Sequence, residues 1–220
     1  MILNTNSYKI SVIMTLYNSG RYFMRALDSV LAQTLKDQEI IIVDDGSDDG
    51  IENLLFPVLK SNNNIKYLRH SNRKHPLSLN AGLRISSGEF ISFLDSDDEY
   101  ISDYLEERVN YFTAHPETDL ICSPAELIGE EEDFYVPDAN DQTRLIHVND
   151  CIIGGTFFGK RKVFEELSGF NNVYSHDSDF YRRAEKVYNV KMLDSKKYIY
   201  YRNNTDSVLS KLKKNTGDYR

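Results

Sequence analysis

The chain has 220 residues, of which 40% are hydrophobic and 27% are charged, as is usual for a soluble globular protein of one domain or one domain with a small extension. Its 34 acidic and 26 basic residues leave a net charge of −8, whereas a protein that binds nucleic acid would carry a basic excess. The charge therefore argues against nucleic acid as a partner.

The cysteines and the N-terminal segment indicate the compartment. Cys122 and Cys151 lie far apart without a CxxC companion, so the sequence disfavours a disulfide framework and a zinc site. Met1–Ile10 lacks the basic region and long apolar run of a signal peptide, and no stretch approaches the roughly 18 apolar residues that span a bilayer. We expect a cytoplasmic protein whose only contact with a membrane is peripheral, at its inner face.

Short apolar strands alternate with amphipathic helices through the first hundred residues. In chain order, the predicted elements are strand Ile10–Met14, helix Arg21–Gln33, strand Glu39–Val43, helix Ile51–Lys60, strand Ile65–Leu68, helix Leu77–Ile85 and strand Phe90–Leu94. The strands are apolar almost throughout, which is typical of strands buried on both faces. The pattern therefore predicts an α/β fold with a central, mostly parallel sheet and helices on both faces.

The second half of the chain is less regular. The elements predicted there are helix Asp103–His115, strand Leu120–Ser123, an acidic loop at Gly129–Gln142, strand Thr156–Phe158, helix Asp177–Tyr188 and strand Lys197–Arg202. We find no internal repeat and no clear linker, so residues 1–220 are interpreted as a single domain. The basic tail, residues 208–220, is interpreted as solvated chain, with loose docking to an anionic membrane as the alternative.

Polar residues follow three of the predicted strands: Thr15–Asn18, Asp44–Ser47 and Asp95–Asp98. Ligands bind at the carboxyl ends of the strands in open parallel sheets, so these segments are candidates for a binding site. Asp95–Asp98 places three carboxylates within four residues, and their repulsion costs stability unless a cation neutralises it. Carboxylate oxygens suit Mg²⁺ or Mn²⁺ better than zinc, and such ions complete their shell with substrate phosphates. The alternative is a solvated acidic turn before the next helix.

Three further residues have both a functional and a structural interpretation. The ring of Tyr17 can stack on a nucleobase, although exposed tyrosines are common. Asp45 can accept a hydrogen bond from a base ring or form part of a plain turn; a calcium loop is excluded because its twelfth position is Phe56. Asp177, at the start of a late helix, can be a general base or a helix cap.

Taken together, these clusters resemble family 2 of the inverting glycosyltransferases, whose fold is called GT-A. The resemblance extends from about Tyr8 to about Ser207 and is strongest in the first hundred residues. It is carried by Ser11–Asn18, Ser29, Gln33–Thr34, Glu39–Ser47, Asn80–Gly82, Gly88–Asp98, Gly169–Phe170, Asp177, Asp179–Phe180, Arg183 and Tyr200–Arg202.

The resemblance implies a role for each matching residue. Asp97 and Asp98 would bind the metal, and Asp177 would be the catalytic base. Gly154–Thr156 would lie beside the donor sugar and the acceptor. The residues implied to bind the nucleotide-sugar are Thr15, Tyr17, Asn18, Asp45, Asn80 and Asp95.

The resemblance also implies the reaction. An inverting glycosyltransferase would move a sugar from a nucleoside-diphosphate donor, with a UDP-sugar favoured, to a hydroxyl of a saccharide or lipid-linked saccharide. The cofactor would be Mn²⁺ or Mg²⁺, and the setting would be synthesis of cell-surface polysaccharide or glycolipid. Residues 8–100 would form the nucleotide- and metal-binding half and residues 101–207 the acceptor half. The oligomeric state, including a homo-oligomer, stays open.

The chain departs from the family pattern at four positions. Thr15 stands where a proline is common, although threonine is an accepted variant. Leu79 stands where an arginine near the diphosphate is common, His176 where a glutamate usually precedes the base, and Asn204 where many members have a histidine. These departures keep open a sugar-nucleotide-binding protein without transfer activity. A sugar-phosphate nucleotidyltransferase is another alternative, although the glycine-rich phosphate loop that it needs near the first strand is absent.

Overall fold

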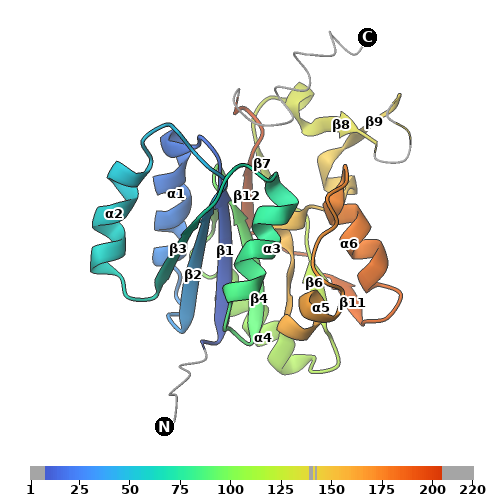
Figure 1. Ribbon diagram of the computed structural model, residues 1–220. Coiled ribbons are helices and arrows are strands. Elements are labelled where there is room, and N and C mark those ends of the chain that lie inside the picture. Colours follow the sequence, from blue (N-terminus) through green and yellow to red (C-terminus); the bar gives the residue numbers. More distant parts are fainter. Residues whose placement is uncertain (1–7, 139–140, 142, 205–220) are drawn as a thin grey trace.

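The computed structural model describes residues 8–138, 141 and 143–204. A seven-stranded sheet forms its centre, in the order β11-β6-β10-β4-β1-β2-β3 (Figure 1). The strands are β1 (Ile10–Leu16), β2 (Gln38–Asp44), β3 (Ile65–Arg69), β4 (Phe90–Asp95), β6 (Leu120–Cys122), β10 (Phe158–Lys160) and β11 (Val190–Met192). Strand β10 runs antiparallel to both of its neighbours, and the other neighbouring strands pair in parallel. The predicted mostly parallel sheet is confirmed.

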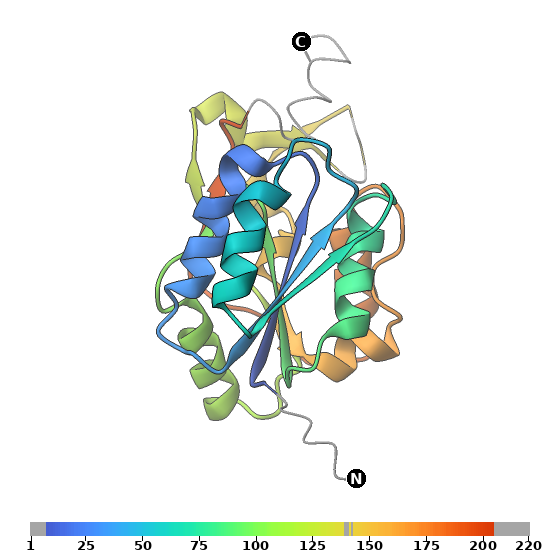
Figure 2. The ribbon, with the colours of Figure 1, turned by 60° about the vertical axis from the view of Figure 1, so that its left-hand side comes forward.

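Helices cover both faces of this sheet, as the continuous apolar strands predict (Figure 2). Successive side chains of a strand point to opposite faces, so Ile13 of β1 belongs to one apolar cluster and Met14 to the other. One face is covered by α1 (Gly20–Leu31), α2 (Glu52–Ser61) and α4 (Tyr104–Ala114). The other face is covered by α3 (His75–Ile85), α5 (Arg161–Glu166) and α6 (His176–Ala184).

Two small sheets lie beside the central one. The first has the order β5-β12-β7, with β5 (Glu99–Tyr100), β12 (Tyr198–Tyr201) and β7 (Glu126–Ile128). The second pairs β8 (Tyr135–Pro137) with β9 (Leu145–His147). Through its pairing with β5, strand β12 brings the end of the described chain back to the loop that follows β4.

The second half differs from the sequence-based prediction in several short elements. The segment predicted as an acidic loop contains a 3₁₀ turn at Glu131–Phe134 and strand β8. Gly154–Thr156 forms another 3₁₀ turn, so the predicted strand begins only at Phe158. Helix α5 was not predicted, and α6 ends at Ala184, short of the predicted Tyr188. These elements are three to nine residues long, too short for hydrophobic periodicity to define them.

Among the described residues, no helix is both long enough and apolar enough to cross a membrane. The basic tail predicted at 208–220 lies outside the described residues. The division into a nucleotide-binding half and an acceptor half stays a prediction.

Candidate active site

The turn after β2 is held by a buried carboxylate. Asp44 accepts hydrogen bonds from the amide of Ser47 (2.8 Å) and the hydroxyl of Tyr67 (2.8 Å), and its Oδ2 lies 3.2 Å from Nε of Arg69. Burial would raise the pKa of Asp44, but these hydrogen bonds and the charge of Arg69 lower it below its ordinary value. Asp44 is therefore an ionised group that shapes the turn.

Asp45, the predicted base-recognition residue, holds the approach to α3. Its carboxylate accepts hydrogen bonds from the amides of Arg73 (2.7 Å) and Lys74 (3.0 Å), and His70 lies 3.3 Å away. Lys74 has φ of 79°, a left-handed conformation that a non-glycine residue adopts only under local constraint. Both carboxylate oxygens of Asp45 are thus engaged by the protein, and the contact with a base stays a prediction.

Asn18, one of the predicted nucleotide-binding residues, lies beside the turn after β2. The amide of Asn18 donates to the hydroxyl of Ser47 (3.0 Å), and the amide of Asp48 donates to the side chain of Asn18 (2.8 Å). Thr15 is 7% exposed, whereas Tyr17 is 53% exposed, so its ring is accessible to a ligand. The loops after β1 and β2 therefore form one surface at the carboxyl edge of the sheet.

Asp98, predicted as a metal ligand, is fastened to β12. It is 1% exposed, and its two oxygens accept hydrogen bonds from the hydroxyl of Tyr198 (2.7 Å) and the amide of Tyr201 (2.9 Å). Burial, followed by the charges of Asp97 and Asp95, raises the pKa of Asp98 well above its usual range. The structure gives Asp98 a contact that sequence reasoning did not foresee, and its role as a metal ligand stays a prediction.

Asp97 and Asp95 are the more open carboxylates of the cluster. Asp97 accepts a hydrogen bond from the side-chain amide of Asn204 (2.7 Å), and burial together with the charge of Asp95 raises its pKa. Repulsion of this kind is what a divalent cation relieves. Among the described residues, however, no group of three potential ligands is arranged to hold a metal by itself. The residues fit a cation that takes only one or two protein carboxylates and completes its shell with donor phosphates.

His75, which the sequence analysis did not select, lies at the centre of the cluster. Its Nε2 is 3.3 Å from Oδ1 of Asp95, and its ring packs edge-on against His176 with centroids 5.1 Å apart. Burial would lower the pKa of His75, but Asp95, followed by the charges of Asp177 and Asp97, raises it. For His176, burial and the charge of His75 lower the pKa to about 4. His75 thus links the loop after β4 with the start of α6.

Asp177 is the second residue of α6. Its Oδ1 accepts a hydrogen bond from the amide of Ser178 (2.7 Å), and its carboxylate also accepts one from the amide of Gly154. A Cβ at Gly154 would lie 3.0 Å from the Cβ of Asp177, so the glycine leaves room for this approach. Burial is the largest influence on Asp177 and raises its pKa above that of an ordinary aspartate. Such a carboxylate is suited to accept a proton.

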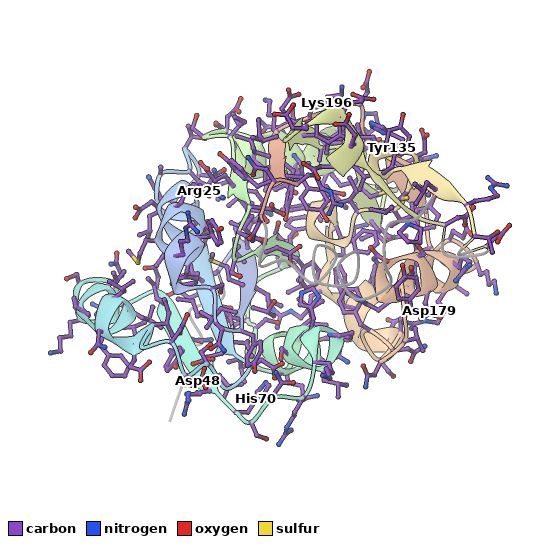
Figure 3. The ribbon with its side chains drawn as sticks, turned by 90° about the horizontal axis from the view of Figure 1, so that it is seen from above. Arg25, Asp48, His70, Tyr135, Asp179 and Lys196 are labelled. Atoms are coloured by element: carbon purple, nitrogen blue, oxygen red, sulfur yellow. The ribbon has the colours of Figure 1, made fainter. Side chains whose placement is uncertain are left out.

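The geometry thus brings together Asp95 at the end of β4, His75 of α3 and Asp177 of α6. All three lie at the carboxyl edge of the central sheet. Figure 3 looks onto this edge from above, with Arg25 of α1 and Asp179 of α6 on opposite sides of it. The comparison with known proteins agrees with this arrangement, because residues 11–168 match the profile of Glycosyl transferase family 2. The chain belongs to this family.

One relative by sequence and two solved structures are also similar to this chain. A glycosyltransferase of Rickettsia typhi is 31% identical over 203 residues, which cover 85% of this chain and 62% of that protein. Residues 1–349 of Staphylococcus aureus TarS, solved with UDP-GlcNAc, have a TM-score of 0.70 at 21% identity, covering 92% of this chain and 60% of that chain. The Pyrobaculum calidifontis mannosyltransferase PcManGT, solved with GDP-Man and Mn²⁺, has a TM-score of 0.66 at 19% identity, covering 89% and 57%. The predicted GT-A fold is confirmed, and the chain spans about three fifths of each of these proteins.

One predicted donor residue of the family pattern lies apart from the cluster. The amide group of Asn80 forms two 2.8 Å hydrogen bonds with the backbone of Phe170, one through its nitrogen and one through its oxygen. The side chain of Asn80 therefore joins α3 to the segment before α6, and its contact with the donor stays a prediction. Leu79, where the family often has an arginine, is 5% exposed and packs in the apolar core.

Proposed function

We propose that this chain carries the donor-binding and catalytic domain of an inverting glycosyltransferase. It would transfer a sugar from a nucleoside diphosphate, with UDP favoured, to a hydroxyl of a saccharide or lipid-linked saccharide. The observation that carries the proposal is the position of His75 at the carboxyl edge of the sheet, where its Nε2 lies 3.3 Å from the carboxylate of Asp95 and its ring packs against His176, the neighbour of Asp177. The UDP-GlcNAc and GDP-Man bound to the two structural relatives support a nucleotide-sugar as the ligand of this edge.

Metal dependence is part of the proposal. Asp97 and Asp98 would hold Mn²⁺ or Mg²⁺, with Asp95 beside them. The ion, when bound, supplies positive charge that stabilises the departing diphosphate. The Mn²⁺ in the Pyrobaculum mannosyltransferase supports this assignment.

The remaining chemistry belongs to side chains of this chain. Asp177 would accept the proton of the acceptor hydroxyl as that oxygen bonds to the anomeric carbon of the donor. The bond between the anomeric carbon and the phosphate oxygen breaks in the same step, and its electron pair leaves with the nucleoside diphosphate. A single displacement inverts the anomeric centre. Tyr17 would stack on the base, and the loop that Asp45 supports would lie beside it.

The first test separates catalysis from binding. Asp177→Asn removes the base while keeping nearly the same size, so transfer should fall on the order of 10²–10⁴-fold. Metal-dependent binding of UDP, measured by calorimetry, should change little. Glu185→Gln, which removes an exposed carboxylate at the other end of α6, is the matched control and should keep full activity. Undiminished transfer by the Asp177→Asn variant would remove Asp177 from the base role.

The donor is tested by titrating UDP, GDP and dTDP into the protein with and without Mn²⁺. Metal-dependent binding of one nucleotide would support the donor site and identify the base. If none binds to the folded protein, the proposal is wrong. Binding without transfer to any acceptor would favour the alternative of a sugar-nucleotide-binding protein. Release of pyrophosphate from a nucleoside triphosphate and a sugar phosphate would favour a nucleotidyltransferase.

A further inference from the structure

The loop that carries Asp97 is held from α1 by one arginine, Arg25. The Nη2 of Arg25 donates a hydrogen bond to the backbone carbonyl of Asp97. Its Nε forms an ion pair with Oε1 of Glu99 (2.9 Å), and its guanidinium carbon lies 3.6 Å from the ring centroid of Tyr201. A single planar group therefore contacts the loop after β4, strand β5 and strand β12.

Tyr201 completes this arrangement from the other side of the loop. Its hydroxyl donates to Oε1 of Glu99 (2.7 Å), the same oxygen that faces Arg25, and its amide donates to Asp98 (2.9 Å). The segment Asp97–Glu99 is thus enclosed between α1 and β12. Beyond β12, Asn204 reaches back to the carboxylate of Asp97. The position of the Asp97 carboxylate therefore depends on Arg25 of α1 and on the residues of β12 and just beyond it.

The loop after β4 carries like charges that repel one another, and contacts with neighbouring elements hold it in place. The charges of Asp95 and Asp97 act against each other, and Asp98 is buried beside them. The charge of Arg25 is among the influences that favour the ionised form of Asp97. The Arg25 side chain is 35% exposed, so its contacts with the loop are partly shielded from water.

We propose that Arg25 is a positioning residue for Asp97, and that it sets how strongly the site binds a divalent cation together with a nucleoside diphosphate. This inference rests on the proposed function. Arg25 acts through the backbone of Asp97 and through Tyr201, without contact with the donor. A lysine cannot replace it fully, because an ammonium group lacks the planar fork that donates in two directions while stacking on a ring.

The test compares nucleotide affinity with and without metal. In the full chain, Arg25→Ala should weaken the binding of UDP at a fixed, subsaturating Mn²⁺ concentration by at least about 10-fold, because a displaced carboxylate binds the cation poorly. Binding of UDP without metal should change less than about threefold, since Tyr17 and the loop at Asp45 are untouched. Arg25→Lys should fall between Arg25→Ala and the parent. A general loss of structure would reduce both affinities alike.

Two variants serve as controls. Arg161, at the amino-terminal edge of β4, also donates from its guanidinium to backbone carbonyls, those of Ser86 and Ser87. Arg161→Ala therefore tests the loss of an arginine that holds a loop at the far edge of the sheet, and it should leave the metal-dependent affinity within about twofold. Tyr201→Phe removes the hydroxyl contact with Glu99 but keeps the stacked ring, so it should produce a smaller loss in the same direction as Arg25→Ala.

The outcomes separate the two proposals. If the parent binds UDP in a metal-dependent manner and a folded Arg25→Ala variant binds equally well, the inference about Arg25 is wrong while the proposed function stands. An equal loss for Arg161→Ala would also overturn the inference. If Arg25→Ala fails to fold, Arg25→Lys decides, because an unchanged metal-dependent affinity in that variant contradicts the proposal. Absence of metal-dependent binding in the parent would overturn both proposals.

Discussion

Burial raises the pKa of both Asp98 and Asp177, but the two carboxyl groups have different hydrogen-bond partners. The oxygens of Asp98 are bonded to the hydroxyl of Tyr198 and to the backbone of β12, so the group links two elements. Those of Asp177 are bonded to amides at the start of its own helix and at Gly154. Buried position alone therefore does not distinguish a carboxylate that joins two elements from a candidate base; the hydrogen-bond partners do.

The raised pKa of Asp177 predicts the acid side of the rate profile. A general base acts only when ionised, so transfer should decline as the pH falls through a value above the ordinary aspartate pKa of 3.8. The charge of His75 lowers the pKa of Asp177, so His75→Gln should move this decline to higher pH. The measurement is kcat/KM for transfer between pH 4 and 8 in both proteins. A shift to lower pH would contradict the predicted coupling.

At the scale of elements, β12 determines the geometry of the loop that carries the aspartates. Tyr198 is fully buried, and its hydroxyl contacts both Asp98 and the amide of Asp95. The 3₁₀ turn at Gly154–Thr156 packs directly against this ring. A Cβ at Gly155 would lie 2.4 Å from the Tyr198 hydroxyl oxygen, closer than any stable contact. The late strand and the turn before β10 therefore fit only because residue 155 has no side chain.

Gly155→Ala tests this packing. The added methyl group must displace Tyr198 from Asp98, and overpacking of this kind costs about 1–3 kcal/mol. Urea denaturation should show a loss in that range, together with weaker metal-dependent nucleotide binding. Gly20→Ala is the matched control, because its Cβ would lie 3.1 Å from the flexible carboxylate of Asp49 and 3.5 Å from Ile51, an ordinary contact. Equal stability of Gly155→Ala and the parent would show that the turn and β12 can move apart freely.

At the scale of the whole molecule, a buried ionic network joins β1, β2, β3 and the segment before β4 at the edge opposite the candidate site. Glu39 is fully buried, accepts hydrogen bonds from the hydroxyl of Ser11 (2.6 Å) and the amide of Ser87, and pairs with Lys66 (2.7 Å). Burial would raise the pKa of Glu39, but these contacts together lower it below its ordinary value of 4.5. The network stabilises the amino-terminal edge of the sheet, and none of its residues belongs to the candidate site at the carboxyl edge.

Acid titration should reveal this network. A carboxylate whose pKa is lower in the folded state adds stability above its unfolded pKa, near 4.5, and that stability is lost as the pH falls through the folded pKa. At pH 7 the parent should exceed Glu39→Gln by about 2 kcal/mol, the scale of hydrogen bonds to charged groups, and the difference should shrink below pH 4.5. Glu89→Gln, in an exposed pair with Lys9, should show almost no difference. A gap that does not narrow as the pH falls below 4.5 would contradict the assignment.

The sequence by itself determined the parallel sheet, its helical layers and the segments at its carboxyl edge. Those predictions succeeded because runs such as Ile10–Met14 are apolar throughout and because the end of a strand is a local feature. The same reasoning selected Asp95, Asp97 and Asp177, whose proposed roles still require the experiments above. It could not define the short elements after β6, whose conformation depends on packing with distant parts of the chain.

The tertiary structure alone decided which side chains meet. The reversed direction of β10 and the junction of Asn80 with Phe170 left no mark in local periodicity. Neither did His75 beside His176, nor Arg25 against Tyr201, since each pair is far apart in sequence. Hydrophobic burial has a period that a sequence displays, whereas a hydrogen bond or ring contact depends on where two separate elements are packed. The sheet could therefore be predicted from the sequence, whereas the contacts of the aspartates at its carboxyl edge could not.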